Sequence, residues 1–339
     1  MRHKWAIAGS LGAVLLVVLA VVLPGHVSTG QSNWNEWRTL ASLRRVDDYP
    51  LYVMTYYGDY DFKGLMQAGT QADAEQPLSY QEIRYAWACT CFSSLNAEGD
   101  VLLGRNFDWY THPALLLFTD PPDGYASVSM VDISYLGFGR ETPSWTARRR
   151  LLYAPHLPFD GINERGLGVG MMAVPDAYDA QEPQKVTLDS LQLIRLLLDY
   201  AQDVDEALSL LPEYNVAFGG GPPVHYLIAD ASGHSAVVEF VDGQMKVLRN
   251  QEPWQVSTNF VISEAMPEGA TSECWRYNTA YEVLEGANGS LSPDEAMALL
   301  NSVSQSSTIW SLVYNLSTGD IQVAMKQKYD RVHEFKLQR

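Results

Sequence analysis

Strand-forming and helix-forming segments occupy separate blocks of this sequence, which favours an α+β domain built in layers over a βαβ repeat. Short apolar or alternating segments between turns predict an antiparallel meander over residues 224–248. Residues 309–316 and 321–326 flank a polar turn and predict a hairpin. Apolar residues three and four apart predict an amphipathic helix over residues 186–200. Another helix is expected to begin at Ser292, which opens a capping box.

The composition supports a substantial core and argues against one class of partner. Of the 339 residues, 47% are hydrophobic and 19% are charged, which is enough apolar material for one large domain or two small ones. The formal net charge is -17, so the chain as a whole repels nucleic acids and anionic lipid headgroups. We therefore expect no nucleic-acid partner.

The amino terminus predicts export. Residues 5–23 are almost wholly apolar and follow a short basic segment, a pattern that places the amino terminus in the cytoplasm and the remainder outside it. The apolar length lies between that of a secretory signal and that of a spanning helix. Residues 1–30 are therefore either a signal peptide, cut near residues 28–30, or a retained membrane anchor. No lipobox cysteine is present, so a lipoprotein is not expected.

Standard catalytic and metal-binding motifs are missing from the sequence. HExxH, GxSxG and GxxxxGK[ST] do not occur, and the seven histidines show no metal-ligand spacing. The three cysteines, Cys89, Cys91 and Cys274, are too few for a disulfide scaffold and lack the paired CxxC spacing of a zinc site. We expect neither a metal nor another cofactor, and at least one free thiol.

Cys89 lies on the first strand of a hairpin predicted over residues 85–92 and 101–109. A thiol nucleophile needs a base, and no histidine neighbours Cys89 in the sequence. Cleavage between Ala88 and Cys89 creates an α-amine on the nucleophile itself, with a pKa of about 7.7 to 8, that can serve as the base. The alternative is that Cys89 is a small buried hydrophobic residue, the commoner fate of a lone cysteine.

The order of the segments that follow Cys89 resembles a known enzyme group. They are Cys-Thr at 89–90, Gly-Arg-Asn-Phe-Asp-Trp at 104–109, Asn-Glu-Arg-Gly-Leu at 163–167, Val-Ser-Thr-Asn-Phe at 256–260 and Cys-Trp-Arg at 274–276. Together they resemble the amino-terminal-nucleophile (Ntn) hydrolases of the choloylglycine hydrolase group, which includes bile salt hydrolase, penicillin V acylase, acid ceramidase and N-acylethanolamine acid amidase. The resemblance runs from about residue 88 to the carboxyl end and implies a four-layer αββα sandwich.

Carried over to this sequence, the resemblance implies roles for five residues. Cys89 would be the nucleophile, with its own α-amine as general base once the preceding peptide bond is cleaved. Arg105 would lie beside the sulfur and favour the thiolate, and Asp108 would hold the α-ammonium. Asn259 would donate its side-chain amide to the developing oxyanion. Arg276 would complete the charged groups around the nucleophile.

Two features depart from the bile salt hydrolases. Where they carry an Asn after the Asn-Glu-x-Gly-Leu segment, this chain has Ala173, which keeps a backbone N–H but no polar side chain. The resemblance therefore does not extend to bile salt specificity. The long segment before Cys89 is more like that of acid ceramidase, in which a propeptide is cut off and stays associated. Residues 31–88 are accordingly expected to be a propeptide or small chain, and residues 89–339 the catalytic domain.

Several of these residues also have a purely structural explanation. Arg105 and Asp108, three residues apart, can form an ordinary surface ion pair. Asn163 more naturally supports a turn before Gly166 than touches substrate. Cys91 is either a core residue or the partner of Cys274 in a disulfide. The apolar side chains that follow the hairpin either line an acyl pocket or belong to the core; they are Trp109, Tyr110, Leu115, Leu116, Leu117, Phe118, Tyr135, Phe138 and Trp145.

The function that we expect is that of an exported cysteine Ntn hydrolase. It cleaves a linear, non-peptide amide bond of a small N-acyl substrate through a thioester on Cys89, after autoproteolysis between Ala88 and Cys89. One alternative is acyl transfer to an amine, as in the aminopenicillanic acid acyltransferases. Another is an unprocessed binding protein tethered to the membrane through residues 5–23. The sequence leaves the substrate and the oligomeric state open.

Overall fold

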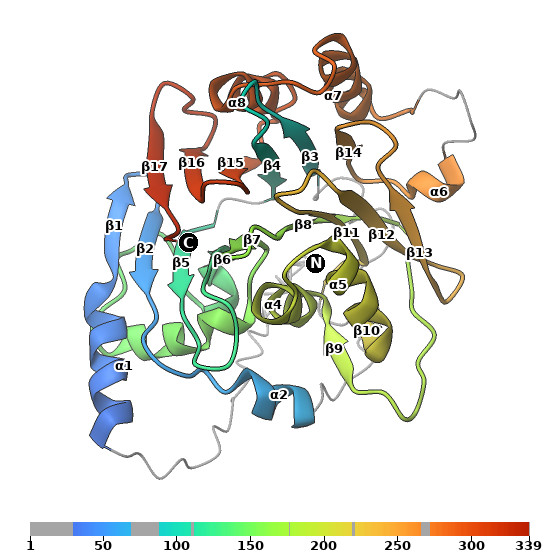
Figure 1. The fold of residues 1–339 in the computed structure, drawn as a ribbon. Helices are drawn as coiled ribbons and strands as arrows, with labels where there is room; N and C mark the ends of the chain where they lie inside the picture. The colour runs from blue at the N-terminus through green and yellow to red at the C-terminus, as the bar shows by residue number, and fades with distance from the viewer. Residues whose placement is uncertain are drawn as a thin grey trace, which may run out of the picture.

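Two stacked β-sheets, each covered by helices on its outer face, make up the structure (Figure 1). This computed structural model describes residues 30–68, 88–109, 112–175, 177–218, 221–265 and 272–338. The apolar segment 5–23 and Tyr110 lie outside the described residues. Among the described helices, none is both long and apolar enough to cross a membrane.

The larger sheet has nine strands, and only β2 and β5 are parallel neighbours. In spatial order the strands are β1 (Arg44–Asp47), β2 (Leu51–Thr55), β5 (Ala114–Thr119), β6 (Ser127–Asp132), β7 (Asp160–Asn163), β8 (Gly168–Ala173), β11 (Val224–Ala229), β12 (Ser235–Val241) and β13 (Gln244–Arg249). The predicted meander is confirmed, because β11, β12 and β13 pair in antiparallel succession.

The smaller sheet has six strands, all antiparallel to their neighbours. In spatial order they are β14 (Gln255–Ser257), β3 (Thr90–Leu95), β4 (Val101–Asp108), β15 (Thr308–Asn315), β16 (Asp320–Met325) and β17 (Val332–Lys336). Both predicted hairpins are confirmed, as β3 with β4 and as β15 with β16. A separate parallel pair joins β9 (Thr187–Asp189) to β10 (Asn215–Ala217).

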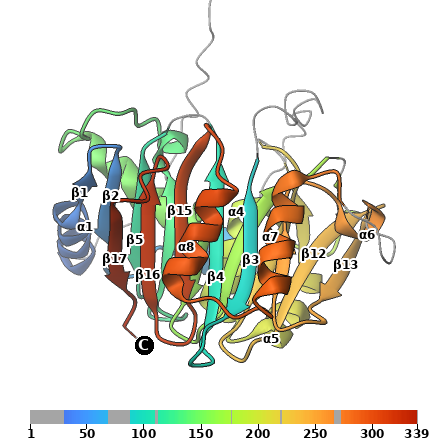
Figure 2. The ribbon, with the colours of Figure 1, turned by 90° about the horizontal axis from the view of Figure 1, so that it is seen from above.

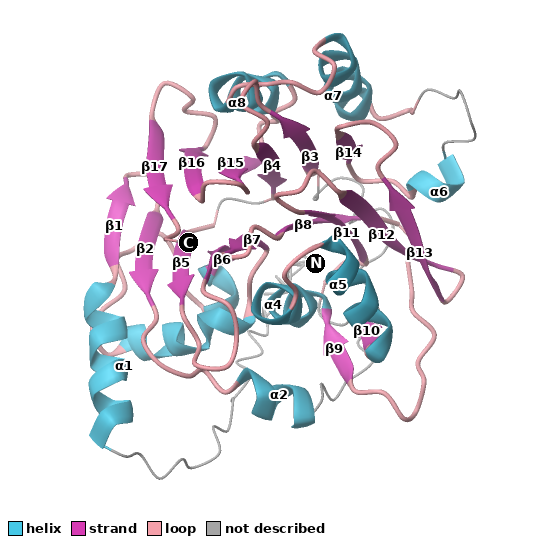
Figure 3. Ribbon diagram, in the orientation of Figure 1, coloured by secondary structure: helices cyan, strands magenta, loops and turns pink. Residues whose placement is uncertain are grey.

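Helices lie outside the two sheets, so the order of layers is helix, sheet, sheet, helix (Figure 3). Those over the smaller sheet are α7 (Trp275–Gly286) and α8 (Pro293–Ser302), which cross β3, β4 and β15 in Figure 2. Those on the side of the larger sheet are α1 (Gly30–Ser42), η2 (Ala147–His156), α4 (Ser190–Tyr200) and α5 (Val204–Leu210). The shorter ones are α2 (Phe62–Ala68), η1 (Ile133–Leu136), η3 (Leu211–Glu213) and α6 (Ile262–Ala265). The α+β prediction is confirmed.

Local sequence signals explain where the two best-capped helices begin. Asp189 and Gln192 form a capping box at the start of α4, and Ser292 and Glu295 form another at the start of α8. Each box satisfies backbone N–H groups that the first helical turn leaves without partners. The start predicted at Ser292 is therefore confirmed.

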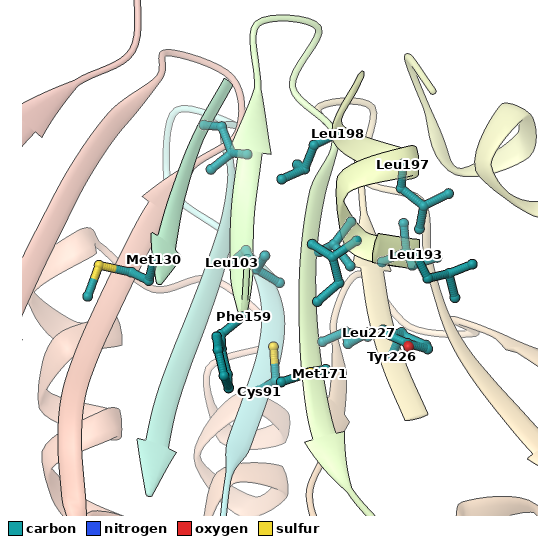
Figure 4. Close-up of a cluster of buried hydrophobic side chains, with 14 of the residues drawn as sticks. Cys91, Leu103, Met130, Phe159, Met171, Leu193, Leu197, Leu198, Tyr226 and Leu227 are labelled. Carbon is teal, nitrogen blue, oxygen red and sulfur yellow. The ribbon is translucent and has the colours of Figure 1, made fainter. Parts of the chain in front are cut away.

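The main core lies between the two sheets. Cys91 and Leu103 of the smaller sheet are buried in one cluster with Phe159 and Met171, which Figure 4 shows together. The sheets approach closely here because β8 carries Gly170. A Cβ atom at that position would lie 2.9 Å from the sulfur of Cys91, closer than packed atoms allow.

Part of the segment before residue 88 belongs to the larger sheet, because residues 44–55 supply β1 and β2. The pairing of β2 with β5 runs from Leu51 opposite Ala114 to Thr55 opposite Phe118. Side chains of β2 are buried in the core. A chain break after residue 88 would therefore leave the preceding segment held by a continuous strand pairing.

Candidate active site

The interior end of β3 brings four of the five predicted residues together at Cys89. The backbone N–H of Cys89 donates to Oδ1 of Asn259 at 2.5 Å, and its carbonyl accepts from Nη1 of Arg276. Its Sγ lies 3.9 Å from Nη2 of Arg105. Cys89 itself is buried. The predicted nucleophile therefore sits in a closed, polar setting inside the protein.

The register of the β3–β4 hairpin explains the spacing of the predicted residues. Cys91 faces Arg105, so Ala88 comes opposite Asp108, whose carbonyl lies 3.5 Å from the Ala88 nitrogen. Alternate side chains of a strand point to opposite faces, so Arg105 and Asp108 approach Cys89 from different sides. Both side chains are fully buried. The alternative of an exposed ion pair between these two residues is therefore wrong.

Arg105 is held by a buried carboxylate that the sequence did not reveal. Its Nη1 donates to the carbonyl of Phe159 at 2.6 Å, and its Nε lies 3.5 Å from Oδ2 of Asp160. Asp160 also accepts from the indole N–H of Trp310 at 3.1 Å and from the hydroxyl of Tyr314 at 2.7 Å. This network fixes the guanidinium beside the Cys89 sulfur and balances its charge.

The thiols differ in their surroundings. Burial raises the pKa of the Cys89 thiol, and the nearby charge of Arg105 acts in the opposite direction. In the uncut chain Cys89 is thus a neutral thiol that needs a base. Burial raises the pKa of Cys91 to about 12, as expected for an inert core thiol. All three cysteines are free, and Cys274 accepts a hydrogen bond from Thr258 at 3.4 Å instead of pairing with Cys91.

Asp108 and Gln305 flank the peptide bond between Ala88 and Cys89. Burial raises the pKa of Asp108 to about 6. The hydroxyl of Thr308 donates to Asp108 at 2.5 Å, and the side-chain amide of Gln305 donates to it at 3.0 Å. The same amide nitrogen lies 3.5 Å from the carbonyl oxygen of Ala88. Sequence reasoning missed Gln305 and Thr308, which reach the site from the start of β15.

Asn259 and Arg276 form a second group of polar side chains in contact with Cys89. Asn259 donates one side-chain N–H to the carbonyl of Ala173 at 2.7 Å, and its Oδ1 also accepts from Nη2 of Arg276 at 3.1 Å. Arg276, in the first turn of α7, further contacts the hydroxyl of Thr90 at 3.1 Å. In the uncut chain the Asn259 oxygen thus receives the Cys89 N–H. Its role as an oxyanion donor stays a prediction.

A buried histidine and glutamate support the loop that carries Asn259. Nε2 of His225 lies 2.6 Å from the carbonyl of Thr258, and Nδ1 lies 3.2 Å from Glu239. Glu239 also accepts two backbone N–H groups, at residues 262–263. Burial raises the pKa of Glu239, but the hydrogen bond and charge of His225 outweigh burial and leave it lowered. Nε2 of His225 also lies 3.0 Å from the hydroxyl of Ser257, so this side chain joins the end of β14 to the Thr258 carbonyl beside Asn259.

Two further expectations concern residues away from Cys89. Asn163 holds the turn before Gly166, since its Oδ1 accepts from the backbone N–H of Leu167 at 3.0 Å and its amide donates to Ala201 at 2.7 Å. The structural interpretation of Asn163 is therefore confirmed. Leu115, Leu116 and Leu117 of β5 are fully buried core side chains. Among the described residues, no cluster of three or more His, Cys, Asp or Glu is placed to hold a metal ion.

The chain resembles known proteins in its family signature, its sequence and its fold. The family described as linear amide C–N hydrolases, choloylglycine hydrolase family, matches residues 89–260. A penicillin V acylase of Pectobacterium atrosepticum is 24% identical over 193 residues, which cover 51% of this chain and 49% of that protein. The chain thus matches about half the length of this curated relative.

Solved structures of low sequence identity share the fold. A mutant of the conjugated bile acid hydrolase from Clostridium perfringens aligns with a TM-score of 0.55 and 16% identity, covering 74% of this chain and 92% of that one. The penicillin V acylase from Agrobacterium tumefaciens aligns with a TM-score of 0.53 and 20% identity, covering 74% and 86%. The layered arrangement of sheets and helices is thus common to all three.

Proposed function

This chain belongs to the choloylglycine hydrolase family of linear amide C–N hydrolases, and from that membership we propose that it is an exported amidohydrolase. It cleaves a linear, non-peptide amide of a small N-acyl compound through a thioester on Cys89. One observation carries the proposal: the sulfur of Cys89 faces the buried guanidinium of Arg105 while its backbone nitrogen is held by Asn259.

Maturation begins with the Cys89 thiol, which attacks the carbonyl carbon of Ala88. The bond from that carbon to the Cys89 nitrogen breaks, the nitrogen takes up the thiol proton, and a thioester forms. Water then hydrolyses the thioester, which yields the Ala88 carboxylate and returns the thiol. The Gln305 amide, 3.5 Å from the Ala88 oxygen, lies where negative charge develops in the first step. The family match also supports this cleavage site, since it begins at Cys89.

Turnover uses the α-amine that maturation releases. The amine takes the proton of the Cys89 thiol, and the thiolate attacks the acyl carbon of the substrate. When the tetrahedral intermediate collapses, the proton passes to the departing amine and the acyl group stays on sulfur. Water, activated by the same α-amine, hydrolyses this thioester and regenerates the enzyme.

The surrounding charges favour the forms that this cycle needs. Arg105, fixed by Asp160 at 3.5 Å, stabilises the thiolate. Asp108, opposite residue 88 in the hairpin, is placed to accept a hydrogen bond from the new α-ammonium. Asn259 turns its amide toward the oxyanion once the peptide at residue 88 is gone. An oxyanion donor of this kind contributes about 10² to 10³ in rate.

The amino-terminal segments have separate roles in this proposal. Residues 5–23, with their basic flank, direct export and either leave with a signal peptide or remain as an anchor. Residues 31–88 form a small chain that stays bound after cleavage. The parallel pairing of β2 with β5 and the buried side chains of β2 support this association.

Hydrolysis of a substrate panel tests the proposal. Purified protein is incubated with bile salts, penicillin V, acyl-homoserine lactones and fatty acyl amides, and the amine released from each substrate is measured. Release from at least one substrate is expected, with loss in Cys89→Ala and retention in the matched thiol variant Cys274→Ala. Transfer of the acyl group to an added amine in place of water would assign the acyltransferase reaction instead. A cleaved protein that hydrolyses none of these compounds would contradict the proposal.

A further inference from the structure

Exposed tryptophans gather on the outer side of α1. Trp34 and Trp37 are 57% and 50% exposed, and their rings stack with centroids 5.0 Å apart and planes inclined by 14°. The opposite side of the helix buries Thr39 and Leu40 against the body of the protein. Single exposed apolar residues are ordinary, but two stacked indoles of this exposure leave a large apolar area in water.

The neighbouring helix η2 extends this surface with a third tryptophan and with arginines. Trp145, just before η2, is 50% exposed, and the guanidinium of Arg148 lies 5.6 Å from its ring centre. Arg148 also donates to the carbonyl of Leu40 in α1 at 3.0 Å, and Arg149 pairs with Glu36 of α1 at 3.2 Å. These contacts pack η2 against α1. We give the name tryptophan–arginine face to the exposed and half-buried residues Trp34, Trp37, Trp145, Arg148, Arg149 and Arg150 of this helix pair and of the turn before η2.

The charge of this face is opposite to that of the chain. Residues 30–42 and 144–156 together hold four arginines and one acid, Glu36, while the whole chain has a formal charge of -17. At physiological ionic strength charges act over about 8 Å, so a partner close to this face meets its arginines and not the distant acids. Tryptophan and arginine side chains are commonly found at the headgroup level of a bilayer.

The position of the face in the chain points to the same partner. Helix α1 begins at Gly30, and six residues separate it from the apolar segment 5–23. Six extended residues span at most about 20 Å. A segment 5–23 held in a bilayer therefore keeps the start of α1, and the face beside it, close to the headgroups.

We propose that the tryptophan–arginine face is a membrane-docking surface that lies against the headgroups of a bilayer containing anionic lipid. It rests on residues 5–23 remaining as the membrane anchor, one of the two outcomes given under the proposed function, and is independent of the chemistry at Cys89. Docking places the indoles of Trp34, Trp37 and Trp145 at the interface and orients the rest of the protein away from it. Helix α7 lies far from α1 in both Figure 1 and Figure 2, and its Trp275 is 51% exposed.

Quenching by brominated lipid tests the orientation. The full-length chain, with Trp5→Phe to remove the indole inside the apolar segment, is reconstituted into phosphatidylcholine–phosphatidylglycerol vesicles whose phosphatidylcholine is brominated near the headgroup. The fluorescence intensity lost to bromine is expected to fall by more than half in Trp34→Phe/Trp37→Phe. In the matched control Trp275→Phe it stays unchanged. Equal quenching in the parent and the double variant, or a loss in Trp275→Phe, overturns the proposal.

A charge variant and an oligomer measurement complete the test. Arg149→Gln/Arg150→Gln is expected to reduce the quenching in anionic vesicles at least twofold, whereas Arg249→Gln, which removes an exposed arginine paired with Asp205, leaves it unchanged. The alternative is that a second copy of the chain covers the face. In that case quenching is absent, and Trp34→Phe/Trp37→Phe converts a dimer in mild detergent into a monomer. That outcome overturns the proposal. If quenching is absent while amide hydrolysis is intact, only the membrane-docking proposal is rejected. If quenching is observed but the protein hydrolyses no amide, only the proposed enzymatic function is rejected.

Discussion

The side-chain oxygen of Asn259 lies 2.5 Å from the backbone nitrogen of Cys89, although 170 residues separate them in the sequence. Strand pairing explains the contact. In the antiparallel pair of β14 and β3, Ser257 faces Cys91. Two residues further along each strand, Asn259 comes opposite Cys89. The sheet therefore delivers a polar side chain to the proposed nucleophile.

Replacing Asn259 by Ala is expected to remove turnover and leave the fold intact. The amide is the proposed oxyanion donor, so kcat/KM for the amide substrate should fall by about 10² to 10³. Steady-state kinetics and cooperative thermal unfolding measure the two effects. Asn301→Ala, at an exposed position of α8, is the matched control and should change neither. A near-normal rate in Asn259→Ala would reject the role.

His225 is expected to act on turnover through the Thr258 carbonyl. His225→Leu removes the donor 2.6 Å from that carbonyl and loosens the loop that carries Asn259, so kcat should fall by about tenfold or more. Because His225 does not touch substrate, KM should stay within about twofold. His225→Gln retains a donor and should recover part of kcat. An unchanged kcat in His225→Leu, or an equal loss in both variants, would exclude the positioning role.

Substitutions at Arg105 and Asp160 should change the free energy of unfolding and the rate of amide hydrolysis independently. Arg105→Gln leaves Asp160 buried without its cation, which is expected to lower the free energy of unfolding by about 3–5 kcal/mol. Arg105→Gln/Asp160→Asn removes both charges and should restore most of the stability but none of the activity. Denaturant unfolding and amide hydrolysis measure these two quantities. Arg249→Gln, which breaks an exposed pair, should cost under about 1 kcal/mol. An active double variant would contradict the role given to Arg105.

Asp108 is expected to make the stability of the uncut chain depend on pH. Burial raises its pKa from 3.8 to about 6. Between these values the unfolded chain has released the proton and the folded chain retains it, so stability falls as the pH rises from about 4 to about 6 and then levels off. In a Cys89→Ala background, the stability gained by Asp108→Asn over its parent should grow across that window by up to about 3 kcal/mol.

Denaturant unfolding at several pH values across this window measures the difference between Asp108→Asn and its parent. The exposed Asn301 of α8 provides the matched control, since Asn301→Ala removes no ionisable group and should give a difference that does not change over the same range. A difference for Asp108→Asn that is flat from about pH 4 to about pH 6 would show that the carboxyl does not carry a raised pKa.

Local features of the fold were predictable from the sequence, and long-range pairings were not. The hairpin of β15 with β16 and the helix start at Ser292 depend on neighbouring residues, so turn and capping signals revealed them. The parallel pairing of Leu51 with Ala114 joins segments with no shared local signal. The sequence therefore predicted residues 31–88 as a separate piece without showing that residues 44–55 supply two strands of the nine-stranded sheet.

The residues of the candidate site also differ in how far the sequence predicted them. The roles of Arg105 and Asp108 came through the resemblance to a known family, and the predicted hairpin placed both residues on the strand beside Cys89. Asn259 and Arg276 came only through the resemblance to a known family. Asp160 and the His225–Glu239 pair had no motif, because each reaches the site through tertiary packing between the sheets. A buried acid or histidine is distinguished from an ordinary polar residue by its burial, which the sequence alone does not report.

The most direct test of the central claim is the identity of the first residue of the purified protein. Intact-mass analysis and amino-terminal sequencing should find a chain of 251 residues that begins with Cys89, held under native conditions to a smaller chain that ends at Ala88 and released from it only by denaturant. Cys89→Ala should remain uncut. A folded wild-type chain with the Ala88–Cys89 bond intact under all conditions would contradict the account.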